Sequence, residues 1–233
     1  MIKSIIFFFF LCLWTIFAGL AFSPFLLFPK ERLYGPIYIW IKGILLMLKI
    51  FCGVSYTING KEHVINNNSK IIASKHQSTF ETLILFYLIK KPIFIHKYEL
   101  FFIPIFGLYL KKLDMISIDR AFGIRSLKKV ISKSKSKISD GFNLIIFPEG
   151  TRKKPNEPTD YKSGIAGIYK EIDTDVIPVA LNSGLFWPKH TFKIKPGNIV
   201  MEFLPPINRG LSKTDFLKTL ESRIENKTKS LMS

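Results

Sequence analysis

The chain has 233 residues, a length that fits one domain of about 150–200 residues with an accessory segment. It carries 34 Lys and Arg against 17 Asp and Glu, a formal net charge of +17, which favours an anionic partner such as nucleic acid, an anionic membrane surface or an acidic carrier protein. Because 48% of the residues are hydrophobic and 22 are Phe, a nucleic-acid binder is disfavoured and a membrane surface is favoured.

Cysteine and histidine are too sparse for a disulfide framework or a metal centre. The two cysteines, Cys12 and Cys52, lie in apolar runs, and no zinc-ligand spacing can be built from them. The four histidines contain no pair with the spacing of a metal motif: His63, His76, His96 and His190. We therefore expect a reducing compartment and no metal site.

The N-terminal segment is apolar enough to enter a membrane. Residues 4–29 include no charged side chain, and residues 5–22 form an 18-residue apolar core, just long enough to cross a bilayer. Ser23-Pro24 favours a break after it. The alternative is a signal peptide, with Lys3 before the apolar run and Gly19-Leu20-Ala21 as a weak cleavage site, but the run is longer than a normal signal core.

A second apolar stretch, residues 33–54, carries Lys42 and Lys49. These lysines are two helical turns apart and share one face. Such a helix fits the membrane interface, and a spanning helix with snorkelling lysines remains the alternative. We expect residues 1–56 to form two membrane-associated helices and residues 57–233 to form one α/β domain.

From residue 60 onward, short strands alternate with helices. We expect strands at residues 70–74, 93–95, 114–119, 143–147 and 176–181, and helices at residues 79–89 and 126–139. Residues 192–194 and 199–204 are interpreted as a hairpin that turns at Pro196-Gly197, and Ser212-x-x-Asp215 as a capping box that opens a last helix. The alternation predicts an α/β fold with a mixed, largely parallel central sheet flanked by helices.

The helix at residues 126–139 is amphipathic, with several lysines on its polar face. Such a face is usually just solvated, and near a membrane it would also attract anionic lipid. The lysines are Lys128, Lys129, Lys133, Lys135 and Lys137.

A histidine and a glutamate follow the first strand of the α/β region. His76 and Glu81 are five residues apart, which on one continuous helix would separate them by about 140°. They would meet if His76 lay in the loop and Glu81 in the first helical turn. The capping box Ser78-x-x-Glu81 predicts a helix that begins at Ser78. Glu81 either only caps this helix or orients His76 as a general base.

Three further segments carry possible anion contacts. In Phe147–Arg152, Gly150 permits positive φ and Arg152 offers a bidentate fork for phosphate, although a plain turn with a basic edge fits the same residues. Arg120 follows Asp119 at the end of an expected strand, where it is either a surface ion pair or a phosphate ligand. Lys162 precedes Gly164 at the start of a short helical stretch and would add another cation.

Together these segments resemble the 1-acyl-sn-glycerol-3-phosphate acyltransferase family, within the wider glycerolipid acyltransferases. The family's Asn-His, four residues, Asp pattern is similar to Lys75-His76 followed by Glu81, with Lys in place of Asn and Glu in place of Asp. Its other three blocks match in order: Gly107 and then Ile118-Asp119-Arg120; Phe-Pro-Glu-Gly-Thr-Arg at residues 147–152; and the apolar strand around Pro178. The resemblance covers roughly residues 60–207.

The resemblance implies acyl transfer without metal or cofactor. His76 and Glu81 would be the catalytic pair, and amides near Ser78 would be candidate oxyanion donors. The substrate-binding residues would be Arg120, Glu149, Gly150, Thr151, Arg152 and Lys162. The acyl donor would be acyl-CoA or an acidic acyl carrier protein, and the acceptor a lysophospholipid. The enzyme would lie at the cytoplasmic membrane, with its catalytic domain on the cytoplasmic side, beside anionic lipids and without nucleic acid.

Three other interpretations compete with this one. A serine hydrolase is disfavoured because no Gly-x-Ser-x-Gly elbow is present. A non-enzymatic basic membrane-binding protein would explain the charge and the phenylalanines but not the ordered blocks. An acyltransferase for a different acceptor, such as a lyso-ornithine lipid or another lysophospholipid, is the most serious alternative.

Overall fold

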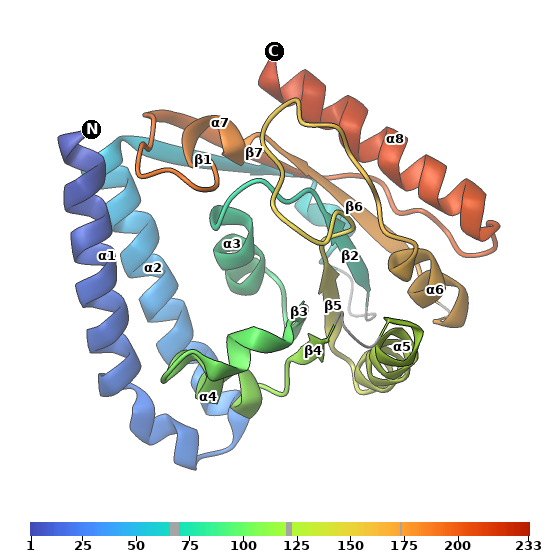
Figure 1. Cartoon of the computed structure of the whole chain (residues 1–233), viewed down its shortest axis with the longest axis horizontal. Helices are drawn as coiled ribbons and strands as arrows, with labels where there is room; N and C mark the ends of the chain where they lie inside the picture. The colour runs from blue at the N-terminus through green and yellow to red at the C-terminus, as the bar shows by residue number, and fades with distance from the viewer. Residues whose placement is uncertain (66–69, 120–122, 173) are drawn as a thin grey trace.

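The structure, a computed structural model, describes residues 1–65, 70–119, 123–172 and 174–233. It consists of a helical hairpin beside an α/β body (Figure 1). The hairpin contains α1 (Ile2–Ala21) and α2 (Tyr34–Cys52), joined by the short helices η1 (Ser23–Leu27) and η2 (Lys30–Leu33). Pro24 lies in the first turn of η1, where the missing N–H of proline is tolerated.

Hydrogen bonds from two tryptophan side chains connect the two helices of the hairpin. Trp14 Nε1 donates to the Trp40 carbonyl at 2.9 Å, and Trp40 Nε1 donates to Thr15 Oγ1 at 3.2 Å. The Trp14 ring lies so close to Gly43 that a Cβ there would come within 2.5 Å of Nε1. α2 then ends at Gly53, whose φ of +67° is the left-handed conformation that glycine adopts readily.

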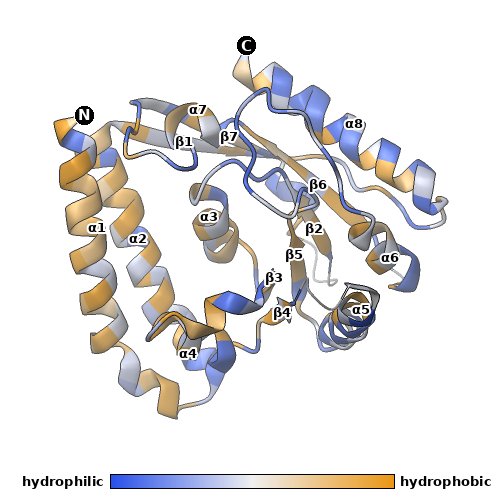
Figure 2. Ribbon diagram, viewed as in Figure 1, coloured by the Kyte–Doolittle hydropathy of each residue, from blue (hydrophilic) through white to orange (hydrophobic). Residues whose placement is uncertain are grey.

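The two helices of the hairpin are apolar along most of their length (Figure 2), and many of their apolar side chains are exposed. Both helices are long and apolar enough to cross a membrane by length and composition. Lys42 and Lys49 are exposed on α2, and the Lys42 ammonium lies 5.6 Å from the centre of the Tyr87 ring. Exposed aliphatic and aromatic side chains continue along α1, including Phe9, Leu13 and Phe17. The two apolar helices indicate membrane association.

The α/β body is built on one seven-stranded sheet with the order β1-β7-β6-β2-β5-β3-β4. All neighbouring pairs are parallel except β6 and β7, which are antiparallel. The predicted α/β fold with a largely parallel sheet is therefore confirmed. The strands are β1 (Val54–Asn59), β2 (Ile71–Ser74), β3 (Pro92–Lys97), β4 (Ile116–Ile118), β5 (Asn143–Ile146), β6 (Val176–Leu181) and β7 (Gly197–Phe203).

Helices cover both faces of the sheet. In Figure 1, α2 and α3 lie on one side, and α5, α6 and α8 lie on the other. Every residue of β2 and β6 is buried, as expected for central strands of a parallel sheet. The body contains α3 (Phe80–Leu88), α4 (Phe106–Lys112), α5 (Gly123–Ser139), α6 (Gly164–Glu171), α7 (Ser183–Phe186), α8 (Lys213–Met232), η3 (Lys61–His63) and η4 (Tyr98–Phe102).

One predicted element is wrong, and one strand was not predicted. Residues 192–194 form no strand, and Gly197 is the first residue of β7 rather than part of a turn. β7 pairs instead with β6 and with β1, which starts at Val54 directly after α2. Apolar residues flanking Pro-Gly satisfy the local rule for a hairpin, but the sheet has a partner for β7 more than 130 residues away, with Gly197 N bonded to Gly53 O at 3.1 Å.

Candidate active site

His76 and Glu81 meet at the carboxyl end of β2. His76 lies in the loop after Ser74, and Glu81 is in the first turn of α3. His76 Nδ1 is 2.9 Å from Glu81 Oε1. Because a carboxylate only accepts, Nδ1 carries the proton in this arrangement, and Nε2 is left as the nitrogen that can take a proton from a substrate. The His76 side chain is 16% exposed, so solvent and substrate can reach it.

The start of α3 differs in detail from the expected capping box. The helix begins at Phe80, two residues later than predicted, and Ser78 Oγ accepts from Phe80 N at 3.2 Å. Glu81 Oε1 reaches back and accepts from the N–H groups of Gln77 and Ser78, both at 2.6 Å. One oxygen of Glu81 thus makes both of the contacts on which the two alternatives depend, with the amides at the helix start and with His76 Nδ1.

These hydrogen bonds also change the expected oxyanion donors. The amides of Gln77 and Ser78 point at the Glu81 carboxylate, so they are not available for a developing oxyanion. The prediction that amides near Ser78 stabilise that charge is therefore wrong for these two groups. The reason is geometric: a glutamate in the first turn of α3 is long enough to accept from both amides itself.

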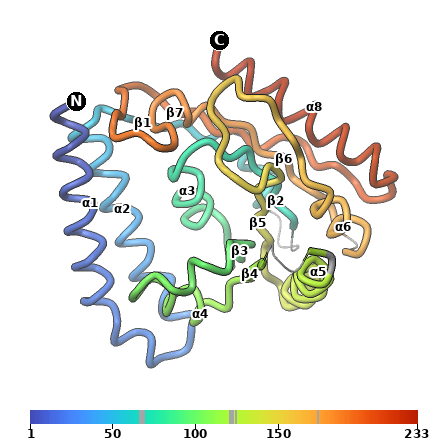
Figure 3. The backbone as a smooth tube through the Cα atoms, viewed as in Figure 1, coloured from blue at the N-terminus to red at the C-terminus, as the bar shows by residue number. Residues whose placement is uncertain are grey.

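Three contacts with His76 come from the segment that follows β5. The Phe147 ring stacks on the imidazole, with ring centres 3.8 Å apart and an interplanar angle of 12°. Glu149 Oε1 accepts from His76 N at 2.9 Å, and Lys153 N donates to His76 O at 2.8 Å. Figure 3 shows this segment running beside the loop that precedes α3. It therefore holds the histidine on its ring and on both backbone polar groups.

A sharp turn allows these contacts. Gly150 has φ +64°, a conformation in which a residue with a Cβ is strained, and its N–H donates to the Phe147 carbonyl at 2.9 Å. Lys162 N donates to the Pro148 carbonyl at 2.9 Å and closes the turn from the other side. The Phe-Pro-Glu-Gly-Thr-Arg block thus has a structural reason for its glycine.

The predicted substrate-binding residues differ in their exposure and in their hydrogen-bond partners. Arg152 is partly buried, and its Nη1 donates to Thr79 Oγ1 at 3.1 Å, three residues beyond His76. Thr151 is exposed, and the Lys162 ammonium pairs with Asp160 on the surface. Glu149 is buried, with both of its oxygens occupied by protein donors. Arg120 lies outside the described residues.

Sequence reasoning missed Ser183. Its hydroxyl donates to Glu81 Oε2 at 2.8 Å, and both side chains are buried. Ser183 lies two residues after the end of β6, as the first residue of α7, and β6 lies beside β2 in the sheet. The position of a polar residue after a buried strand was visible in the sequence, but its proximity to Glu81 required the strand order. Gly184 N likewise donates to Gln77 Oε1 at 3.0 Å.

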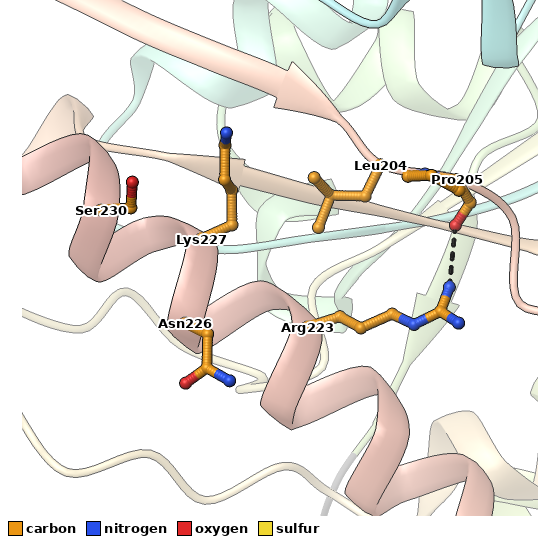
Figure 4. A pocket seen from close by; sticks show the side chains of 6 residues that line it. All are labelled: Leu204, Pro205, Arg223, Asn226, Lys227 and Ser230. Carbon is orange, nitrogen blue, oxygen red and sulfur yellow. Dashed lines mark hydrogen bonds between the residues drawn. The ribbon is translucent and has the colours of Figure 1, made fainter.

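A pocket on the other side of the sheet shares no residue with this site. It lies between α8 and the chain that follows β7, where Arg223 Nη1 donates to the Pro205 carbonyl at 3.2 Å (Figure 4). Among the residues that the structure describes, no group of three His, Cys, Asp or Glu side chains is placed to hold a metal ion.

Comparison with known proteins places the chain in a family. The Acyltransferase family matches residues 55–182, more than half of the chain. The 1-acyl-sn-glycerol-3-phosphate acyltransferase of Pseudomonas aeruginosa is 30% identical over 169 residues, covering 72% of this chain and 65% of that protein. The protein of the same name from Cocos nucifera is 28% identical over 182 residues, covering 77% and 58%. The chain therefore spans less than two thirds of the length of these curated relatives.

A solved structure has the same fold. The crystal structure of the 1-acyl-sn-glycerophosphate (LPA) acyltransferase from Thermotoga maritima matches with a TM-score of 0.80 at 20% identity, covering 99% of this chain and 97% of that chain. The match extends over the helical hairpin as well as the α/β body. Since the family match also contains His76, Glu81 and residues 147–152, the resemblance seen in the four blocks is confirmed: the chain belongs to the Acyltransferase family.

Proposed function

We propose that this protein transfers a fatty acyl group from an acyl thioester to the sn-2 hydroxyl of 1-acyl-sn-glycerol 3-phosphate, which forms phosphatidic acid. The observation that carries the proposal is the His76 imidazole, 2.9 Å from the buried Glu81 carboxylate, with its second ring nitrogen left for a substrate. Relatives that are 30% and 28% identical to this chain are named 1-acyl-sn-glycerol-3-phosphate acyltransferases.

His76 would move one proton in each half of the reaction, with Glu81 stabilising its charged form. His76 Nε2 takes the proton of the sn-2 hydroxyl as the oxygen attacks the thioester carbonyl. The carbonyl becomes a tetrahedral oxyanion, and the imidazolium is stabilised by Glu81 at Nδ1. When the oxyanion collapses, the C–S bond breaks and the thiolate leaves. The imidazolium proton neutralises the departing sulfur, so His76 ends as it began.

Arg152 is a basic side chain near His76 that could bind an anionic part of a substrate. Arg152 is held beside the start of α3 by Thr79, where its planar fork suits a phosphate monoester. We propose Arg152 and Arg120 as ligands of the acceptor phosphate. The donor would be acyl-CoA or an acidic acyl carrier protein, both of which are attracted by a chain of net charge +17.

An acceptor panel tests the proposal directly. Membranes that contain the protein are supplied with 1-acyl-sn-glycerol 3-phosphate, lysophosphatidylcholine, lysophosphatidylethanolamine or a lyso-ornithine lipid, each with acyl-CoA and with acyl carrier protein as donor. We expect the phosphate monoester to be the best acceptor by kcat/KM. A preference for a zwitterionic or lyso-ornithine acceptor would replace the proposed substrate, and no turnover with any pair would remove the proposed activity.

The same panel applied to Arg152→Lys tests phosphate recognition. Lysine keeps the charge but loses the bidentate fork, so kcat/KM should fall by about tenfold or more for the phosphate monoester. The fall should be smaller for an acceptor without an exposed monoester. Lys193→Arg on the exposed segment before β7 is a matched control that should leave the ratio between acceptors unchanged. Equal acceptor ratios in parent and Arg152→Lys would contradict the proposed role.

We further propose that the hairpin inserts into the cytoplasmic membrane, with the α/β body on the cytoplasmic side and the α5 lysines toward anionic lipid. The exposed apolar side chains of α1 support this placement. High salt screens surface charge but not apolar insertion, so the full chain should stay with membranes washed in 1 M salt, measured by immunoblot of pellet and supernatant. Release by salt alone would contradict inserted helices.

A further inference from the structure

A buried cluster of charged side chains lies behind His76. Lys75, the residue directly before the histidine, points away from it, and its side chain is only 3% exposed. Around its ammonium are Glu149, from the segment after β5, and Glu225, on α8. Charged side chains are rarely buried without a compensating partner, so this cluster needs an explanation beyond packing.

The Lys75 ammonium has a hydrogen-bond acceptor for each of its three protons. It donates to Glu149 Oε2 at 3.1 Å, and to Glu225 Oε1 and Oε2 at 2.8 and 3.0 Å. Tyr161 OH donates to Glu225 Oε1 at 2.9 Å and fixes the second carboxylate. The ammonium is therefore held by two parts of the chain that are distant from Lys75 and from each other in sequence.

Glu149 connects this ammonium to the histidine. Its Oε1 accepts from His76 N at 2.9 Å, its Oε2 accepts from Lys75, and its side chain is 0% exposed. Both oxygens are thus directed at the protein rather than at the substrate side. The glutamate of the Phe-Pro-Glu-Gly-Thr-Arg block accepts a hydrogen bond from the backbone of His76, and Lys75 donates a hydrogen bond to the same glutamate.

We infer that Lys75 is a positioning residue: its buried ammonium, held by Glu225, keeps the Glu149 carboxylate charged and directed at the His76 backbone N–H. The catalytic consequence rests on the proposed function, in which His76 is the base. A lysine can do this because its side chain is long enough to reach both carboxylates from the end of β2. The ion pair between Lys75 and Glu225 also connects α8 to the site.

Opposing effects act on the pKa of the buried Glu149 carboxyl. Burial raises the pKa of Glu149, against the lowering effects of Lys75 and of the His76 N–H, and Glu225 raises it again. The charged or titratable groups at the cluster are Lys75, Glu149, Glu225, Tyr161 and His76. Glu221 also acts on Tyr161, and Glu157 and Lys229 line the same pocket as Lys75 and Glu225. Removing the ammonium leaves the buried Glu149 carboxylate and the partly buried Glu225 carboxylate without this cation, so the pKa of Glu149 should rise further.

The test is Lys75→Met, which keeps the length of the side chain and removes the charge. The acid limb of the kcat profile should move to higher pH by about one unit or more, and kcat at pH 7 should fall about tenfold or more. KM for the lysolipid should stay within about twofold, because Glu149 does not face the acceptor. Combining Lys75→Met with Glu149→Gln should cancel the displacement of the acid limb, since the Glu149 carboxylate is no longer there to titrate.

A second readout does not need turnover. With 15N-histidine in detergent-solubilised protein, the His76 amide resonance, assigned through its loss in His76→Ala, should report the ionisation of Glu149. Its midpoint should lie at higher pH in Lys75→Met than in the parent. If Lys75→Met does not fold, Glu149→Gln is used instead. It must remove one titration step from the pH dependence of the His76 amide resonance. A parent amide insensitive to Glu149→Gln would overturn the inference.

Lys70→Met is the matched control. Lys70 precedes β2 at its other end, is largely buried, and pairs with Asp175 at 3.5 Å. Its replacement should lower the melting temperature without moving the acid limb. An acid limb in Lys75→Met equal to that of the parent would overturn the positioning role even if the protein were destabilised. If the parent were inactive but its His76 amide resonance showed the expected pH dependence, the proposed function would be contradicted and the inferred role of Lys75 towards Glu149 would still hold.

Discussion

His76→Ala should lower the rate of acyl transfer by about 10²–10⁴-fold, the usual loss when a general base is removed. His76 Nδ1 lies 2.9 Å from Glu81 Oε1, which leaves Nε2 as the ring nitrogen that can take a proton. The measurement is single-turnover transfer of a labelled acyl chain to 1-acyl-sn-glycerol 3-phosphate in membranes that contain equal amounts of protein.

The protein should remain folded in this variant. Alanine loses the stacking with Phe147 and the bond to Glu81, but the Gln77 and Ser78 amides and the Ser183 hydroxyl still donate to the carboxylate. His63→Ala is the matched control, because His63 follows β1 at the opposite edge of the sheet. A folded His76→Ala protein that retained the parent rate would remove His76 as the base.

Glu81→Gln should reduce the rate by on the order of 10²-fold with a much smaller effect on stability. The amide oxygen of Gln can take the place of Oε1 and accept from His76, Gln77 and Ser78. Its NH2 group can donate to Ser183 Oγ, which now donates to Oε2. The hydrogen bonds are thus retained, and what is lost is the negative charge that stabilises the imidazolium.

Glu81→Asp separates charge from length. It keeps the carboxylate and should therefore retain more activity than Glu81→Gln, although the shorter side chain must shift to reach the same donors. Rates and melting curves for the two variants distinguish the two functions of Glu81. If Glu81 served only the start of α3, Gln would support activity as well as Glu does, since Gln is equally suited to a capping box. A folded Glu81→Gln enzyme with parent turnover would falsify the dyad.

The sequence alone predicted those features of this protein that depend on local patterns. The uncharged run of residues 4–29 predicted an apolar helix, which the structure has as α1, and the buried strand of residues 176–181 has the same bounds as β6. Ser212 caps α8 by accepting from Asp215 N at 3.1 Å, as its capping box predicted. The four ordered blocks also identified the family. Each of these conclusions depends on neighbours within one element or on the order of motifs.

The tertiary structure alone decided which distant groups meet. Lys75 and Glu225 are 150 residues apart, and Ser183 is 102 residues from Glu81, so no periodicity in the sequence relates them. Their proximity follows from the strand order, which brings the ends of β2, β5 and β6 to one edge and lays α8 across them. The same order gave β7 its partner β1 in place of a local hairpin. Non-local pairing depends on closing long loops and burying whole faces, which local propensity does not encode.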